Sequence, residues 1–234
     1  MNNSNLAENY RTVVDRIHAA ERQAGRQAGS VSLVAVGKLH PAQAVRTLAE
    51  CGQRIFAENF VQEAIGKQRM LSDLQLEWHF IGSIQSNKTK DIANHFSWVH
   101  SVDRYKIARR LNDQRPDDLP PLNLCVQTNL QGEATKSGVA GEQLLPLLDE
   151  IASLPRVRIR GLMIIPEPVD TVERQRAVFA RLRQWLELAI KQGHPLDTLS
   201  MGMTADMEVA ISQGSTHVRI GTALFGPRPS RTQR

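Results

Sequence analysis

The sequence predicts an α/β protein, specifically a (β/α)8 TIM barrel, and two observations carry that prediction. Eight short apolar runs recur along the 234 residues, and a segment able to form a helix precedes each of them. Such alternation favours a parallel sheet that helices bury on both faces. The first run is followed by VGKLHPAQA, which has one glycine and no GxGxxG phosphate loop. An open, doubly wound sheet therefore ranks below the barrel.

The elements follow in a regular order. Apolar residues recur at helical spacing between Leu6 and Ile17, ahead of Gly25, and predict an amphipathic helix at the N-terminus. The strands are predicted at residues 31–38, 54–59, 77–82, 97–102, 121–130, 157–165, 198–203 and 217–226. No linker rich in Gly, Ser or Pro divides the chain, so residues 1–227 are expected to form a single barrel domain. Residues 228–234 are predicted to be a basic, disordered tail.

Composition and charge narrow the classes of function. Hydrophobic residues make up 41% of the chain, which is usual for a folded globular protein. No apolar stretch approaches the roughly 20 residues of a bilayer span, and no secretory pattern opens the chain, so we expect a cytoplasmic protein with no membrane partner. The net charge is +5, but three of the arginines lie in the tail and only 5% of residues are aromatic. We therefore expect no nucleic-acid partner.

Cysteine usage and topology give two further expectations. Cys51 and Cys125 lie far apart, without CxxC or Cys/His spacing, so no disulfide framework or zinc site is indicated and buried thiols are expected. A closed barrel leaves no sheet edge for pairing with another chain, which favours a monomer.

Polar residues gather where the predicted strands end, and in a TIM barrel the chemistry lies at the carboxyl ends of the strands. These residues, in chain order, are Lys38, Glu58, Asn59, Gly82, Ser83, Gln85, Asn129, Met163, Ser200, Thr204, Arg219, Gly221 and Thr222. The strand ends are thus the candidate functional site.

Lys38 ends the first apolar run, VSLVAVGK. An amine at the mouth of a barrel is partly stripped of water and faces polar groups, which makes it a nucleophile toward carbonyls and able to form a Schiff base. The plain alternative is a lysine that points into solvent from a loop. The glycine-bearing turns after the seventh and eighth strands, with Thr204 and Thr222 beside them, are where such barrels hold a phosphate. A lysine and a phosphate cradle together predict pyridoxal 5′-phosphate (PLP) as cofactor.

Arg219 lies two residues before Gly221 and is predicted to face the pyridine nitrogen of that cofactor. An arginine keeps its proton, so the ring nitrogen would stay unprotonated and the cofactor would be a weak electron sink. Such a cofactor is poorly suited to carbanion chemistry. The alternative, an arginine at the surface or an interface, is equally compatible with a single arginine in a strand.

Several longer sequence motifs, taken together, are specific enough to indicate a protein family. They are LVAVGK, FAENFVQE, LEWHFIGSIQSNK, the KSG at 136–138, RGLM at 160–163, LSMGMTADMEVAI and VRIGTALFG. Through them nearly the whole chain resembles the pyridoxal phosphate homeostasis proteins, the YggS/PROSC group, which are related to the barrel domain of alanine racemase. The resemblance implies an alanine-racemase-like barrel that carries PLP as an aldimine on Lys38. The implied cofactor-binding residues are Lys38, Asn59, Met163, Ser200, Gly202, Met203, Thr204, Arg219, Gly221 and Thr222.

Four positions depart from the pattern of that family. Gly37 and Thr204 stand where serine is usual, Leu39 where threonine is common, and Ala57 where glycine is usual. Thr204 keeps a hydroxyl, so a phosphate contact is expected to survive there. Gly37 has no hydroxyl, so no supporting side-chain hydrogen bond is expected from that position.

The predicted function is a carrier that buffers PLP and delivers it, with little or no turnover and with transient contacts to PLP-dependent apo-enzymes. A racemase needs an acid and a base on opposite faces of the substrate, commonly a lysine and a tyrosine. Tyr10 and Tyr105 are predicted in helices away from the barrel mouth. By the resemblance, the second domain that completes the racemase site also has no counterpart here.

Three alternatives remain open at this point. A weak PLP-dependent amino-acid racemase would use Lys38 on one face and His79, His100 or a water on the other. The basic tail, residues 228–234, would recruit an acidic partner or RNA. Lys136, in the TKSG loop, would offer a transient second aldimine during release of the cofactor.

Overall fold

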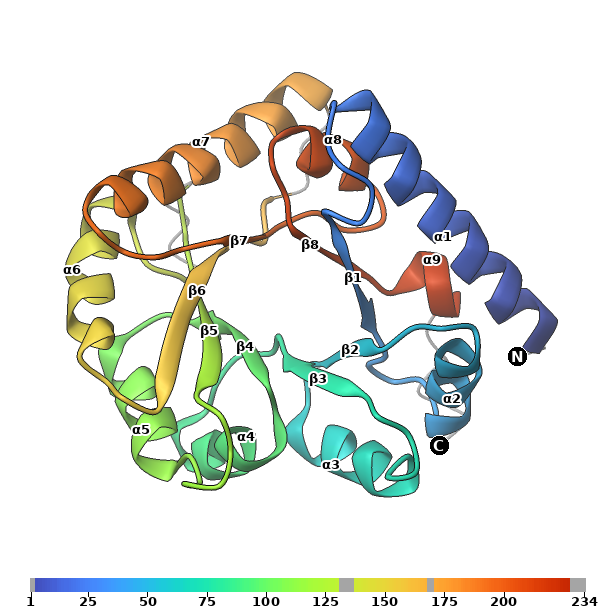
Figure 1. Cartoon of the computed structure of the whole chain (residues 1–234), viewed down its shortest axis with the longest axis horizontal. Helices are drawn as coiled ribbons and strands as arrows, with labels where there is room; N and C mark the ends of the chain where they lie inside the picture. Colours follow the sequence, from blue (N-terminus) through green and yellow to red (C-terminus); the bar gives the residue numbers. More distant parts are fainter. Residues whose placement is uncertain (1–2, 131–136, 168–170, 228–234) are drawn as a thin grey trace.

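The computed structural model of the chain describes residues 3–130, 137–167 and 171–227. Eight parallel strands close a barrel in sequence order, and the last pairs with the first (Figure 1). The strands are β1 (Ser32–Val36), β2 (Ile55–Glu58), β3 (Glu77–Phe80), β4 (Trp98–Val102), β5 (Leu122–Gln127), β6 (Val157–Met163), β7 (Thr198–Ser200) and β8 (His217–Ile220). The prediction of a (β/α)8 barrel is confirmed.

Helices surround the barrel (Figure 1). They are α1 (Asn3–Gln23), α2 (Ala42–Glu50), α3 (Val61–Met70), the 3-10 turn η1 (Ser86–Lys88), α4 (Thr89–His95), α5 (Tyr105–Gln114), α6 (Gly141–Ala152), α7 (Val172–Lys191), α8 (Met207–Ser212) and α9 (Thr222–Phe225). None of the helices in the described ranges is long and apolar enough to span a bilayer.

Most strands are shorter than predicted at their carboxyl ends, and two differences matter for the site. β7 ends at Ser200, because Gly202 takes a φ of 96°, outside the β region. The predicted strand 217–226 is wrong beyond Ile220, since helix α9 begins at Thr222. Phe225 of this helix stacks on the ring of His40 at 4.9 Å between centroids. Residues 201–206 form the loop between β7 and α8, and Gly221 joins β8 to α9.

Helix α1 lies on the outside of the barrel against α2, α8 and α9 (Figure 1). Leu6, Val13 and Ile17 are buried on one of its faces. Arg16, on another face, pairs with Glu208 of α8 at 2.7 Å and donates to the carbonyl oxygen of Thr204 at 3.2 Å. The helix therefore covers the outer wall and also supports the loop after β7.

Alternation along the strands sorts side chains between two cores. Leu33, Ala35 and Phe56 belong to the large core between strands and helices. Val34, Val36 and Ala57 form a separate cluster on the inner side, where Val36 pairs in register with Ala57. Side chains two residues beyond this inner row are therefore directed toward the mouth of the barrel.

The barrel interior is unusually polar for this fold, in which bulky apolar residues normally fill the layers. His79, His100, Ser200 and Arg219 are all buried there. Cys125 is also buried and Cys51 is partly exposed, and both thiols are free. The expectation of buried thiols is thus confirmed for Cys125 alone. Lys136 and the tail at 228–234 lie outside the described residues.

Candidate functional site

A cavity of about 320 Å³ opens at the carboxyl ends of the strands, a volume in the usual range for small-molecule sites. Seven of the ten predicted site residues line it, six from the segments that follow β1, β2, β7 and β8 and one, Arg219, from β8 itself. They are Lys38, Asn59, Met203, Thr204, Arg219, Gly221 and Thr222. The closed barrel brings these residues together because the carboxyl ends of all parallel strands share one rim.

The other three predicted residues lie behind this wall in the described structure. Met163 is fully buried and packs with Trp98 and Cys125. Ser200 is buried and bonded to Arg219, and the Gly202 carbonyl accepts from the Arg219 N–H at 2.9 Å. A Cβ on Gly202 would come within 2.6 Å of the Ala210 side chain. These residues support the cavity rather than line it.

Sequence reasoning missed four lining residues, namely Val36, Ile81, Ile165 and Ala205. Strand periodicity contained the signal for Val36, which lies two residues before Lys38 on the same face. Ala205 directly follows Thr204, so its backbone was part of the predicted turn. Ile81 and Ile165 follow strands whose register the sequence alone does not fix.

Arg219 has a fixed orientation. Its Nη1 donates to the carbonyl oxygen of Ser200 at 2.7 Å and to its hydroxyl at 2.8 Å, and its Nη2 donates to the carbonyl oxygen of Ile164 at 2.9 Å. Among the described residues these bonds use three of the five guanidinium N–H donors. Burial lowers the pKa of Arg219 to about 10, so the group stays charged near neutral pH. The remaining donors are available to a ligand in the cavity.

Backbone donors also line the cavity. In the part of the chain that the structure describes, the N–H groups of Thr204, Ala205 and Gly221 have no protein acceptor. Successive free N–H groups of this kind form a nest for an anion such as a phosphate. The side-chain oxygen of Asn59 is buried without a partner. The cavity lining thus offers free N–H donors and an unsatisfied acceptor, Asn59 Oδ1, together with Lys38.

Hydrogen bonds to side chains of α3 fix the turn that carries Lys38. Leu39 has a φ of 66°, a left-handed conformation that costs a non-glycine residue on the order of 1 kcal/mol. Its N–H donates to Glu63 Oε1 at 2.7 Å, and Lys67 Nζ donates to the Gly37 carbonyl oxygen at 2.7 Å. A Cβ at position 37 would lie 2.9 Å from Glu58 Oε1. Gly37, a departure from the family pattern, therefore leaves room for the Glu58 carboxylate.

Glu58, Glu63 and Lys67 form a cluster behind this turn, which we call the β2–α3 charge cluster. Lys67 Nζ donates to Glu58 at 2.6 Å and to Glu63 at 2.8 Å. Glu58 is fully buried, and its second oxygen has no hydrogen-bond partner. Burial raises the pKa of Glu58 to about 7, and this desolvation outweighs the attraction of Lys67. One lysine is therefore shared by two carboxyl groups behind the turn that carries Lys38.

The raised pKa of Glu58 predicts a pH-dependent stability. A carboxyl whose pKa is higher in the folded chain binds protons preferentially when folded, so its contribution is present at low pH and is lost as pH rises from 4.5 to about 7. We expect Glu58→Gln to remove this loss, which is on the order of 3 kcal/mol. Urea unfolding of both proteins across that window measures the effect. Asp113→Asn, at an exposed ion pair, is the control; equal pH slopes for wild type and Glu58→Gln would contradict the prediction.

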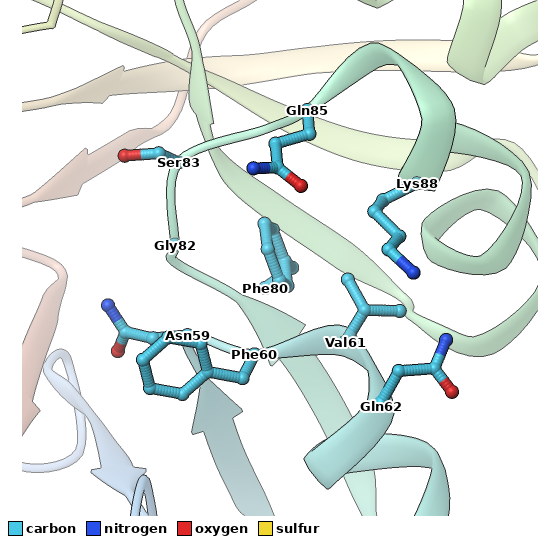
Figure 2. A pocket seen from close by; sticks show the side chains of 9 residues that line it. All are labelled: Asn59, Phe60, Val61, Gln62, Phe80, Gly82, Ser83, Gln85 and Lys88. Atoms are coloured by element: carbon cyan, nitrogen blue, oxygen red, sulfur yellow. The ribbon is translucent and has the colours of Figure 1, made fainter.

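A second cavity of about 520 Å³ adjoins the first and shares Asn59 with it. Figure 2 shows Asn59 and Phe60 at one end and Lys88 and Gln62 at the other. The Phe60 ring is 54% exposed. Asn59 therefore lies between the cavity that contains Lys38 and a larger cavity over β3.

His79 and His100, the predicted bases of the racemase alternative, do not line the main cavity in the described structure. Both are fully buried, and each has both ring nitrogens within hydrogen-bond distance of a neighbour. Tyr10 and Tyr105 also lie outside the lining, in helices α1 and α5. The described lining thus places no imidazole or phenol opposite Lys38.

Comparisons with known proteins agree with this geometry. The family described as alanine racemase, N-terminal domain, matches residues 2–229. A Pseudomonas aeruginosa protein named pyridoxal phosphate homeostasis protein is 57% identical over 225 residues, which are 96% of each chain. An Escherichia coli protein of the same name is 48% identical over 229 residues, covering 96% of this chain and 97% of its own.

Solved structures extend the comparison. PipY of Synechococcus elongatus, determined with PLP bound, has a TM-score of 0.81 and 39% identity, covering 92% of this chain and all of its own. An alanine racemase of Clostridium difficile has a TM-score of 0.75 at 15% identity, and the match covers 96% of this chain but 58% of the racemase. That likeness shows the shared barrel fold alone.

Proposed function

This chain belongs to the alanine racemase N-terminal domain family, among its pyridoxal phosphate homeostasis proteins, and from that premise we propose that it binds PLP and buffers its supply to other proteins. One observation carries the proposal. A single cavity combines the Lys38 amine, the fixed Arg219 guanidinium and the free N–H groups of the loops after β7 and β8. The proposed binding unit is one barrel domain, residues 1–227.

The residues present fit this cofactor. The free N–H groups of Thr204, Ala205 and Gly221, with the Thr204 hydroxyl, form the proposed phosphate site. Lys38 is the proposed covalent anchor: its amine nitrogen bonds to the aldehyde carbon, and the aldehyde oxygen leaves as water. Asn59 supplies an acceptor within the same cavity. Bound PLP would supply carbonyl and electron-sink chemistry.

Binding without robust turnover is the function we propose. Arg219 keeps its proton, so a ring nitrogen facing it stays unprotonated and the cofactor stabilises negative charge poorly. The described lining has no second acid or base across from Lys38. Exposed Phe60, Ile165 and Met203 lie around the mouth, where transient contact with an apo-enzyme is proposed. We retain the monomer as a proposal.

Two measurements test this function together. Titration of the purified protein with PLP, followed by near-visible absorption, reports binding. Racemisation assays with alanine and several other amino acids report turnover. We expect stoichiometric uptake with turnover far below that of ordinary enzymes, whose median kcat is about 10 per second. Absence of uptake would overturn PLP binding, and turnover near that median would overturn the carrier function.

Thr204 tests the phosphate end of the site. Thr204→Val keeps the side-chain shape but removes the hydroxyl, and a hydrogen bond to a charged group contributes about 1.5–3 kcal/mol. We therefore expect the Kd for PLP to rise roughly tenfold. Thr204→Ser keeps the hydroxyl and is expected to bind like wild type in the same absorption titration. Equal affinities for the valine and serine variants would place the phosphate elsewhere.

A further inference from the structure

Four buried or partly buried side chains connect the opposite end of the barrel to Arg219. Glu77 Oε1 lies 2.7 Å from His79 Nε2, and His79 Nδ1 lies 2.9 Å from His100 Nε2. His100 Nδ1 lies 2.7 Å from the Ser200 hydroxyl, which also accepts from Arg219 Nη1 at 2.8 Å. These contacts are continuous, with no gap from Glu77 to Arg219. We call this series the interior chain.

The interior chain crosses the barrel. Glu77 and His79 are on β3 and His100 is on β4, whereas Ser200 and Arg219 are on β7 and β8. These two strand pairs lie on opposite sides of the barrel in Figure 1. Glu77 is the first residue of its strand, and its side chain is 42% exposed. Solvent at the amino-terminal end of β3 is therefore linked to the cofactor site at the carboxyl end of β8.

Donor and acceptor chemistry fixes the direction of every bond in the interior chain. An ionised carboxylate only accepts, so His79 donates to Glu77 from Nε2. Neutral His79 then accepts at Nδ1, which requires that His100 donate from Nε2. Neutral His100 accepts in turn at Nδ1 from the Ser200 hydroxyl. Because the Ser200 hydroxyl proton is used in that bond, the hydroxyl oxygen accepts the hydrogen bond from Arg219 Nη1.

These bond directions require an ionised Glu77 and neutral rings at His79 and His100, and the surroundings favour these charge states. The hydrogen bond from His79 lowers the pKa of Glu77, which keeps the carboxylate ionised. Burial lowers the pKa of His79, and it lowers that of His100 well below the usual value, so both rings are neutral near pH 7. Trp98 stacks on His79 at 5.4 Å between centroids and limits rotation of that ring.

We infer that Glu77, His79, His100 and Ser200 are positioning residues that orient Arg219 toward the ring of bound PLP through a one-directional hydrogen-bond chain. The inference rests on the proposed function for the identity of the ligand. Aligned hydrogen bonds polarise one another, so the acceptor at Glu77 strengthens the acceptor that Ser200 offers to Arg219. The strength of the hydrogen bond between Ser200 and Arg219 therefore depends on Glu77, a residue that lines neither cavity.

Glu77 variants test the inference at its most distant and most exposed residue. Glu77→Ala removes the terminal acceptor, and we expect the ratio of the absorption bands of bound PLP to shift and the Kd to rise roughly threefold. Glu77→Gln keeps an acceptor oxygen and is expected to restore both values. Asp197→Ala is the matched control. Asp197 precedes β7, is ion-paired with Arg160 and is not part of the interior chain. If Glu77→Ala matches Asp197→Ala, or if Glu77→Gln fails to restore binding, the inference is overturned.

A second measurement does not depend on the cofactor. Nitrogen-15 chemical shifts of the histidine rings in the wild-type protein report the tautomers, and we expect Nε2 to carry the proton in both His79 and His100. A proton on Nδ1 of either ring would overturn the direction of the chain. If the wild-type protein bound no PLP, the proposed function would fail, and so would the proposed role of these residues in orienting Arg219 toward the cofactor. The histidine tautomers would still decide the direction of the hydrogen bonds in the interior chain.

Discussion

Lys38→Ala is expected to abolish covalent capture of PLP. In wild-type protein, borohydride reduction should fix a pyridoxyl group that peptide mass mapping places on Lys38. In the variant that adduct is absent, and the Kd for PLP rises roughly 100-fold, because loss of the covalent link and of a charged partner removes on the order of 3 kcal/mol. The proposed phosphate site at Thr204, Ala205 and Gly221 is untouched by the change, so we expect weak, non-covalent binding to remain.

Lys88→Ala is the matched control for this experiment. Lys88 lines the neighbouring cavity and shares the chemistry of Lys38, but it is on the 3-10 turn after β3 (Figure 2). We expect that variant to keep both the adduct and the affinity of the wild type. An adduct that persists in Lys38→Ala, or that disappears in Lys88→Ala, would show that another lysine holds the aldehyde.

Lys67→Met is expected to cause a large loss of folding stability. The Lys67 ammonium group donates to Glu58, Glu63 and the Gly37 carbonyl oxygen, so the variant leaves the Glu58 carboxylate buried and unpaired. Breaking a buried ion pair on one side costs about 3–5 kcal/mol. We expect a loss of this size in urea unfolding near pH 8. The loss shrinks as pH falls toward about 7 and levels off below it, because Lys67 lowers the pKa of Glu58 in the wild type and the variant therefore takes up this proton at a higher pH.

The double variant Lys67→Met/Glu58→Leu separates the buried charge from lost packing. Replacing both members of a buried pair by apolar residues is often nearly neutral, so we expect the second change to restore more than half of the lost stability. If the changes in the free energy of unfolding of the two single variants simply added up in the double variant, a buried, unpaired charge in the β2–α3 charge cluster would not be the cause of the loss. That result would point instead to the methylene groups of Lys67 as the stabilising part.

The fold was predictable because its signals are local. Each strand is a short apolar run, and runs such as VSLVAVGK recur with helical segments between them, so the number and order of the strands can be read along the chain. The ends of β7 and β8 were not predictable in the same way. β7 ends two residues before Gly202, whose φ is positive, and the residues after β8 form a short helix in which Phe225 stacks on His40, a contact distant in sequence.

The candidate site was predictable to the extent that topology alone assembles it. Lys38 and Arg219 meet because the carboxyl ends of neighbouring parallel strands, β1 and β8, share one rim. The supporting residues were harder to assign. Met163 and Ser200 carry motif signals as strong as that of Thr204, yet both lie behind the cavity wall. A one-residue change of register reverses the face a side chain takes, and the sequence does not fix that register.

The sequence by itself therefore determined the barrel, the strand order and the rim on which Lys38, Thr204 and Arg219 lie, because short-range periodicity and fold topology are sufficient for these features. Only the tertiary structure decided what lies behind the rim. The β2–α3 charge cluster and the interior chain from Glu77 to Arg219 join side chains from separate strands and helices. Their partners are set by strand register and by burial, which create strong electrostatic coupling only after the barrel has closed.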